Sequence, residues 1–169
     1  DFVGNRRVPD EKLYEYMIGG TEERMLKDPE QFPFVEADIK TGTDRIRGLY
    51  EQEGYAEAVV EEPLIHFTRD RAWADVLVQV HEGPRYGFGT VEFIGDTIYP
   101  TEDLIGGLGT PINEPFTAQR VGSMQRNLEF FYKSRGHFLA QTTAIADPAQ
   151  AVATARAPDG SGYDRLVPV

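Results

Sequence analysis

The chain has 169 residues, of which 40% are hydrophobic and 27% are charged, so it has enough apolar side chains for one domain core or two small ones. The formal net charge is −11 and no Lys/Arg cluster occurs, which argues against nucleic-acid binding and against docking on anionic lipid through a basic patch. The absence of cysteine excludes disulfides, thiol catalysis and cysteine-based metal sites. No apolar run approaches the ~20 residues of a membrane-spanning helix.

The chain opens with the end of a strand and a turn, over residues 2–5. Gly4 accepts a positive φ there, and Asn5 can bond its own backbone. Pro9 and Asp10 then start a helix, for which we predict Asp10 as the N-cap. The chain begins without an initiator Met or a signal peptide, and it ends in the strand-like residues 166–169. We therefore expect a piece of a larger protein.

A second helix is predicted to end at Gly54, because a glycine in the left-handed conformation commonly terminates a helix. Its buried face is indicated by apolar residues at helical spacing, namely Ile39, Ile46, Leu49 and Tyr50. Two strands joined by a polar hairpin loop follow, over residues 58–67 and 73–80. Pro63 lies inside the first of these, and proline is restricted to sheet edges or bulges because it lacks an N–H donor.

The same blocks recur in the same order in the second half of the chain. The strand end and turn of residues 2–5 match residues 93–96, and the helix end before Gly54 matches one before Gly136. The last strand of the first half, residues 74–80, matches residues 163–169. Such self-similarity indicates one structural unit repeated in tandem.

The second copy is predicted to differ from the first mainly in its gaps. A change in the apolar alternation near Gly89 indicates a bulge or kink in its first strand. Its second helix has an apolar face formed by Val121, Met124, Leu128 and Phe131. A strand is predicted directly after Gly136, and an Ala/Gly/Pro-rich stretch, residues 146–162, between the last two strands.

The order of elements predicts an α+β fold of two tandem β-α-α-β-β modules with helices on one sheet face. The module boundaries are residues 1–83, with a truncated first strand, and residues 84–169. A short joint containing proline cannot act as a floppy tether, so we expect a restricted inter-module hinge. Its residues are Glu82, Gly83, Pro84 and Arg85.

No set of residues in the sequence points to catalysis. An acidic hydrolase would need a nucleophile with a base and an orienting group, or clustered metal ligands, and neither is found. The three histidines, His66, His81 and His137, share no ligand spacing. We therefore expect a non-enzyme with no catalytic, cofactor-binding or metal residues and no cofactor.

Three motifs together resemble one known family. Residues 88–96 read FG-x-V-x-F-x-G-D, Y-x-x-x-G precedes Tyr55 and His137, and residues 78–83 read V-x-V-x-E-G. This ordered set resembles the polypeptide-transport-associated (POTRA) domains of outer-membrane assembly proteins similar to BamA and TamA. The resemblance implies a three-stranded mixed sheet in each module, with two helices on one face and the second strand at an open edge.

The resemblance also implies a function. It predicts the periplasmic polypeptide-binding and scaffolding part of an outer-membrane β-barrel assembly machine, continuous in the full-length protein with a membrane barrel absent from this sequence. The expected partners are unfolded outer-membrane or secreted polypeptides and periplasmic accessory proteins, and not nucleic acid. The alternative is the POTRA part of a two-partner secretion transporter or of another protein-translocation system.

The open edge is the candidate binding site. An extended peptide could add to it as a further strand, with backbone bonds that give affinity independent of sequence. The predicted edge residues are Ala58, Val59, Val60, Glu61, Glu62, Leu64, Ile65 and Phe67. The alternative is an ordinary protected edge, on which Pro63 and the two glutamates serve only to prevent aggregation.

Overall fold

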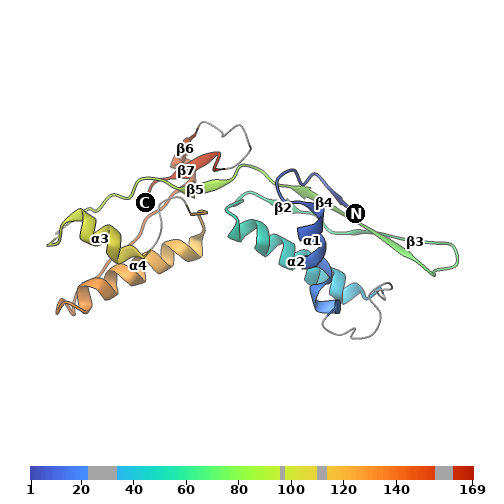
Figure 1. Ribbon diagram of the computed structural model, residues 1–169, viewed down its shortest axis with the longest axis horizontal. Helices are drawn as coiled ribbons and strands as arrows, with labels where there is room; N and C mark the ends of the chain where they lie inside the picture. Colours follow the sequence, from blue (N-terminus) through green and yellow to red (C-terminus); the bar gives the residue numbers. More distant parts are fainter. Residues whose placement is uncertain (23–33, 96–97, 110–113, 155–161) are drawn as a thin grey trace. The chain divides into compact units, whose positions relative to one another are not determined.

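The computed structural model describes residues 1–22, 34–95, 98–109, 114–154 and 162–169 (Figure 1). The chain divides into two compact units by its internal contacts. Unit 1 consists of Asp1–Glu51 and Glu57–Gly83, and unit 2 consists of Gln52–Ala56 and Pro84–Val169. Each unit has its own sheet, its own helices and its own core.

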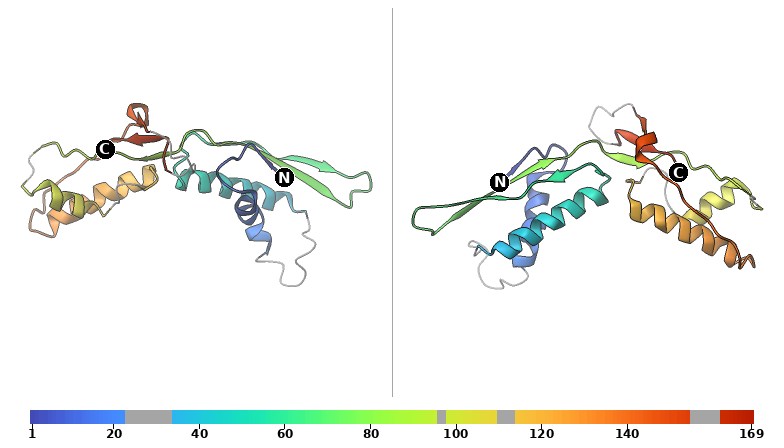
Figure 2. Two further views of the ribbon diagram at one scale, coloured as in Figure 1. Left: turned by 45° about the horizontal axis from the view of Figure 1, so that its top comes forward. Right: turned by 180° about the vertical axis from the view of Figure 1, so that it is seen from behind.

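Unit 1 is built around one long central strand. Its elements in chain order are β1 (Phe2–Val3), α1 (Asp10–Glu22), α2 (Glu36–Gln52), β2 (Val59–Val60), β3 (Leu64–Phe67) and β4 (Ala74–His81). β1 runs parallel to β4, whereas β2 and β3 pair with β4 in the antiparallel sense. Both helices lie on the same face of this sheet (Figure 2).

β2 and β3 are two parts of one interrupted edge strand. Val60 pairs with Val80 and Leu64 pairs with Leu77, so the three residues between them on the edge face only two residues on β4. The extra residue is a β-bulge, and it falls at the position of Pro63. The prediction that this proline marks an edge or a bulge is confirmed, whereas the prediction of one continuous strand over residues 58–67 is wrong, because the bulge breaks the ladder.

The core of unit 1 follows the predicted apolar pattern. Val78 and Val80 of β4 are buried, while their neighbours Leu77, Gln79 and His81 are exposed. Helices α1 and α2 cover that face with buried side chains, namely Leu13, Met17, Ile46, Leu49 and Tyr50. The side chains that alternate on β4 and those that recur every 3.6 residues on α2 therefore pack together in one core.

Unit 2 repeats the architecture, and its central strand β7 is shorter than β4. Its elements are β5 (Tyr86–Phe88), α3 (Thr101–Leu108), α4 (Ala118–Lys133), a 3₁₀ turn η1 (Pro148–Gln150), β6 (Val152–Ala153) and β7 (Arg165–Val167). The sheet order is β5-β7-β6, with β5 parallel and β6 antiparallel to β7. Helices α3 and α4 lie on one face (Figure 1). The α+β fold of two tandem modules is thereby confirmed.

The second strand of unit 2 does not lie where the sequence predicts it. Residues 137–147 form no strand, and the strand that pairs with β7 is β6, inside the Ala/Gly/Pro-rich stretch. A strand exists only where a partner backbone is available, and β7 is already paired with β6 on that side. Gln125 of α4 instead bonds to the non-strand segment, through Thr142 and Ala144.

The bulge predicted near Gly89 is confirmed. The Gly89 N–H bonds to the Val167 carbonyl, as in a regular parallel ladder. In a regular ladder the Val169 N–H would then donate to the Gly89 carbonyl, but it donates to the carbonyl of Thr90. In the same way, the N–H that donates to the Val169 carbonyl is that of Glu92 and not that of Val91. The ladder has thus gained one residue on the first strand.

The helix ends confirm the sequence signals in part. Gly54 and Gly136 both have φ of 93°, as a helix-terminating glycine requires. Asp10, by contrast, is the first helical residue and not the N-cap. The carbonyl of the preceding Pro9 accepts from Leu13, which places the N-cap position at the proline.

Candidate functional site

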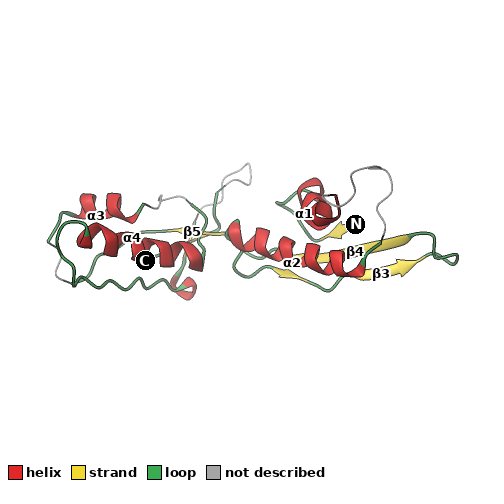
Figure 3. Ribbon diagram, turned by 90° about the horizontal axis from the view of Figure 1, so that it is seen from below, coloured by secondary structure: helices red, strands yellow, loops and turns green. Residues whose placement is uncertain are grey.

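The described edge of unit 1 offers unpaired backbone on β3. Thr68 donates to the Trp73 carbonyl, so Leu64 and His66 also belong to hydrogen-bonded pairs with β4. The alternation directs the N–H and C=O groups of Ile65 and Phe67 away from β4. Within the described parts of the chain, no strand pairs with this outer side of β3. An extended backbone could therefore bond to both residues. β3 lies beside β4 in the ribbon view of Figure 3.

A tight hairpin turn holds the far end of β3. The Thr68 hydroxyl donates to Asp70 Oδ1 at 2.7 Å, and the Ala72 N–H donates to the same oxygen at 3.1 Å. The bond from Thr68 lowers the pKa of the Asp70 carboxyl, and the bond from Ala72 adds to this effect. Arg71 completes the turn with φ of 57°. The β3 edge is thus anchored at its end by local bonds.

Apolar side chains surround the β3 edge. Leu64 pairs directly with Leu77 across the two strands, and Leu64 is 66% exposed. Trp73, at the hairpin, is 63% exposed. Phe67 stacks edge-on against Phe34, with ring centroids 5.1 Å apart. Peptide side chains that alternate along an added strand would therefore meet apolar neighbours.

The predicted edge residues occupy different environments. Leu64, Ile65 and Phe67 form β3, and they lie beside the unpaired backbone. Glu61 and Glu62 are exposed at the bulge, and Ala58 precedes β2. Val59 is exposed, whereas the Val60 side chain is buried. The sequence thus locates the edge, but β3 is its accessible part.

The first two predicted hinge residues are packed within unit 1. Glu82 is only 8% exposed, and its carboxylate accepts bonds from the N–H groups of Arg7 and Val8. It also accepts a bond from the Tyr50 hydroxyl at 3.2 Å. Gly83 has φ of 68°. Sequence patterns indicate a joint here, but they give no sign that Glu82 joins the β1–α1 turn to α2.

The other two predicted hinge residues, Pro84 and Arg85, belong to unit 2. Arg85 pairs with Glu53 at 2.9 Å and lies 5.0 Å from the centroid of the Tyr163 ring. Burial raises the pKa of the Tyr163 phenol, although the Arg85 charge opposes that shift. Arg85 is therefore held in place by an ion pair and an aromatic contact.

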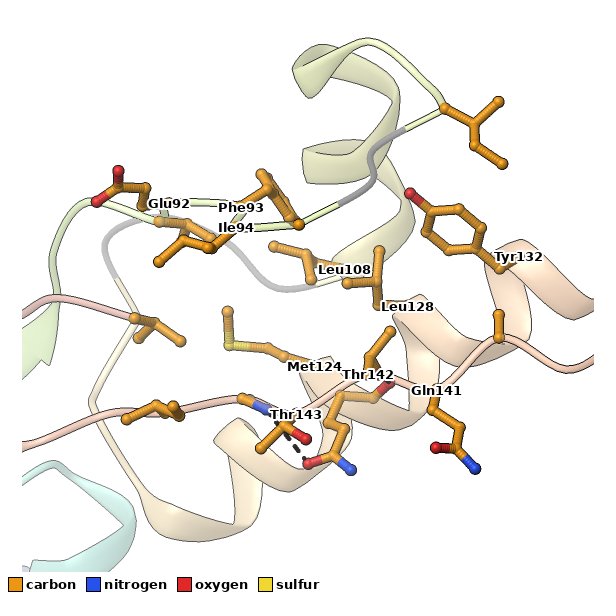
Figure 4. A pocket seen from close by; sticks show the side chains of 18 of the residues that line it. Glu92, Phe93, Ile94, Leu108, Met124, Leu128, Tyr132, Gln141, Thr142 and Thr143 are labelled. Atoms are coloured by element: carbon orange, nitrogen blue, oxygen red, sulfur yellow. Dashed lines mark hydrogen bonds between the residues drawn. The ribbon is translucent and has the colours of Figure 1, made fainter. Parts of the chain in front are cut away.

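Unit 2 contains a large groove that sequence analysis does not predict. It has a volume of about 1190 Å³ and lies between residues 90–95 and residues 138–145. Phe93 and Ile94 lie on one side of it and Thr142 and Thr143 on the other (Figure 4). Its floor is apolar, formed by Leu108, Met124 and Leu128. The groove follows from the displaced second strand, because residues 90–95 and 138–145 face each other and no strand of the described part of the chain lies between them.

The described residues show no arrangement for metal binding. None of their His, Asp and Glu side chains form a group of three or more that could hold an ion. A search of the same residues found no helix long and apolar enough to span a membrane.

The family follows from the repeats. The POTRA family model, described as surface antigen variable number repeat, matches residues 1–83 and again residues 86–159. The chain belongs to the POTRA family. It contains two POTRA repeats in tandem, as the recurring blocks indicate. None of the curated proteins compared with the chain matches it significantly.

Solved POTRA structures resemble this chain at low identity. The N-terminal domain of Omp85 from Thermosynechococcus elongatus is 13% identical to this chain, with a TM-score of 0.50. The match covers 99% of this chain and 57% of the Omp85 chain. POTRA3-5 of Haemophilus influenzae BamA is 18% identical with a TM-score of 0.49, covering 99% and 62% respectively. The POTRA chain thus spans about three fifths of these structures.

Proposed function

We propose that this tandem POTRA chain is a polypeptide-binding scaffold in the periplasm, and that it belongs to a BamA-like outer-membrane protein assembly machine. Its partners in this proposal are unfolded outer-membrane or secreted polypeptides and periplasmic accessory proteins. The single observation that carries the proposal is the unpaired outer side of β3, at Ile65 and Phe67. It is an interaction surface and not a reaction centre, so the proposed role is binding and not catalysis.

The mode of binding is strand addition. Each outward residue offers one N–H donor and one C=O acceptor, which any extended backbone can satisfy. Such bonds select extended conformation more than sequence, which suits a protein with many clients. The exposed Leu64 and Leu77 beside them favour clients with an apolar residue at every second position. That alternation is the pattern of strands in outer-membrane barrels.

A restricted joint between the repeats is part of the same proposal. Glu82 and Arg85 are each held by bonds within their own unit, so Gly83 and Pro84 are the part of the predicted hinge that lies between them. The chain also passes between the units at Glu51–Gln52 and at Ala56–Glu57. Proline fixes its φ near −65°, which limits the angles available at that position. Small-angle scattering that shows free, wide-range motion of the repeats would contradict this part.

Peptide titration tests the binding edge. A peptide of alternating apolar and polar residues, copied from a barrel strand, is added to the isotope-labelled chain and followed by backbone NMR shifts. We expect the largest shifts at Leu64–Phe67 and the hairpin that follows. An absence of shifts throughout the chain at millimolar peptide would overturn the proposal.

Two variants at one position separate backbone from side-chain binding. Ile65→Pro removes an outward N–H while leaving the bonds of Leu64 and His66 to β4 in place. Ile65→Ala shortens the side chain but keeps that N–H, and so is the matched control. We expect roughly two- to tenfold weaker peptide binding in Ile65→Pro than in Ile65→Ala.

A further inference from the structure

One side chain of α2 reaches the sheet edge at β2. The Nε and Nη2 atoms of Arg47 both donate to the backbone carbonyl of Val60, at 3.2 and 2.9 Å. Arg47 Nη1 also pairs with Asp44 Oδ1 at 2.6 Å on the same helix. A planar guanidinium held at both ends is a well-oriented donor. Arg47 therefore does more on this face than solvate the helix.

The Val60 carbonyl is one of the outward groups of the edge. The Glu61 N–H donates to the carbonyl of Gln79 in β4, so Glu61 and Gln79 form a hydrogen-bonded pair of the antiparallel ladder. By alternation along β2, the C=O of Val60 points away from β4, toward the position of an added strand. The N–H of an incoming peptide would bond to this oxygen, and the Arg47 guanidinium already occupies it.

The two halves of the edge therefore differ. On β3, no side chain in the described part of the chain bonds to the outward backbone groups of Ile65 or Phe67. On β2, the charged Arg47 guanidinium donates two bonds to the outward carbonyl of Val60. Such charge-assisted bonds are roughly twice as strong as neutral ones. The bulge at Pro63 also breaks the register between the two halves, so one regular strand cannot pair with both without adjusting.

We propose that Arg47 determines where strands add: it closes the β2 half of the edge and confines polypeptide binding to β3. This inference rests on the proposed function and deepens it. The ligand it specifies is a short extended segment, paired over about one β3 length instead of the whole edge. Fewer backbone bonds mean weaker, faster-exchanging binding, which a scaffold that passes on its clients requires.

Arg47→Met is the decisive variant. Methionine keeps an unbranched stem along the helix but cannot donate to Val60, so the carbonyl becomes available. Arg45→Met is the matched control, because Arg45 is an exposed residue of the same helix two positions away and so points to another side. Arg47→Lys keeps the charge but replaces the planar fork by a single ammonium.

The measurement is the titration with the barrel-strand peptide, read as a map of shifts along the chain. In the natural sequence and in Arg45→Met, we expect shifts at β3 and none at β2. In Arg47→Met, we expect them to extend to Val59–Val60, with binding roughly two- to tenfold tighter. Arg47→Lys should fall between. If the role of Arg47 were merely structural, Arg47→Met would lower the melting temperature but the same residues would shift on peptide addition.

Each outcome decides one of the two claims. Shifts at β2 already in the natural chain, or a map unchanged in Arg47→Met, overturn the role of Arg47 and leave binding at the edge intact. Binding that appears in Arg47→Met alone overturns the edge as a natural site but supports Arg47 as its block. Absence of binding in every variant overturns both.

Discussion

The Glu82 carboxylate accepts a hydrogen bond from the backbone N–H of Val8 at 3.2 Å, across 74 positions of sequence. The same carboxylate also accepts hydrogen bonds from the Arg7 N–H and from the Tyr50 hydroxyl. One buried acidic side chain thereby joins the turn after β1, helix α2 and the end of β4. Buried donors that lose their acceptor are costly, so this residue has a measurable structural role.

Replacement of Glu82 by alanine should strongly destabilise unit 1. We expect the free energy of unfolding to fall by about 3 kcal/mol in Glu82→Ala and by about 1–2 kcal/mol in Glu82→Gln, which keeps one acceptor. Urea denaturation measures both. Glu51→Ala, at an exposed position of α2, is the control and should change little. Equal stabilities of Glu82→Ala and the control would refute this role.

The equivalent glycines of the two repeats should respond differently to alanine. Gly4 has φ of 96°, and a Cβ there would collide with the Val80 carbonyl oxygen. Gly95 has φ of 116° but open space around it. We expect Gly4→Ala to cost about 3 kcal/mol or more, and Gly95→Ala about 1–2 kcal/mol.

Gly48 provides the opposite case in the same set of denaturation curves. It lies inside α2, and a Cβ there would meet nothing within 4 Å. Gly48→Ala should therefore raise the free energy of unfolding by about 0.5–1 kcal/mol. A loss of stability in Gly48→Ala would show that this part of α2 is more crowded than the structure indicates.

Two adjacent aromatic residues of α4 should differ sharply in importance. Phe131 is 8% exposed, with the Arg135 guanidinium 3.6 Å from its ring centroid, whereas Phe130 is 72% exposed. Phe131→Ala should cost about 3–5 kcal/mol of unfolding free energy, and Phe130→Ala less than about 0.5 kcal/mol. Thermal melting of the pair checks this, and similar losses in both would contradict the assigned helix face.

The groove of unit 2 should accept a strand attached to β7. Val169 lines the groove and already bonds to Glu92, so a segment appended after it would run between residues 90–95 and 138–145. A six-residue extension with apolar residues at alternate positions should raise the melting temperature and slow amide exchange in both walls. The control carries proline at every second position. Unchanged exchange in the walls would show that the groove does not take a strand.

Local sequence patterns were sufficient to predict the repeat, the order of the elements and the buried faces of the helices. Gly54 and Gly136 end helices because their conformation is local, and Val121, Met124 and Leu128 share a face because the helical period is local. The bulge near Gly89 and the position of Pro63 at an edge were likewise predictable. The same helical period places Phe131 on this face and Phe130 off it, in agreement with their burial.

The pairing of the strands and the long-range bonds between polar groups could not be predicted from local patterns, because they depend on the packing of distant elements. The strand expected after Gly136 gives way to β6 because the side of β7 can accept a single partner. Arg47 reaches the Val60 carbonyl, and Glu82 the turn at Val8, because the packing of α2 and β4 brings distant residues within hydrogen-bond reach. Local patterns specify conformation, but hydrogen-bond partners distant in sequence depend on how the elements pack.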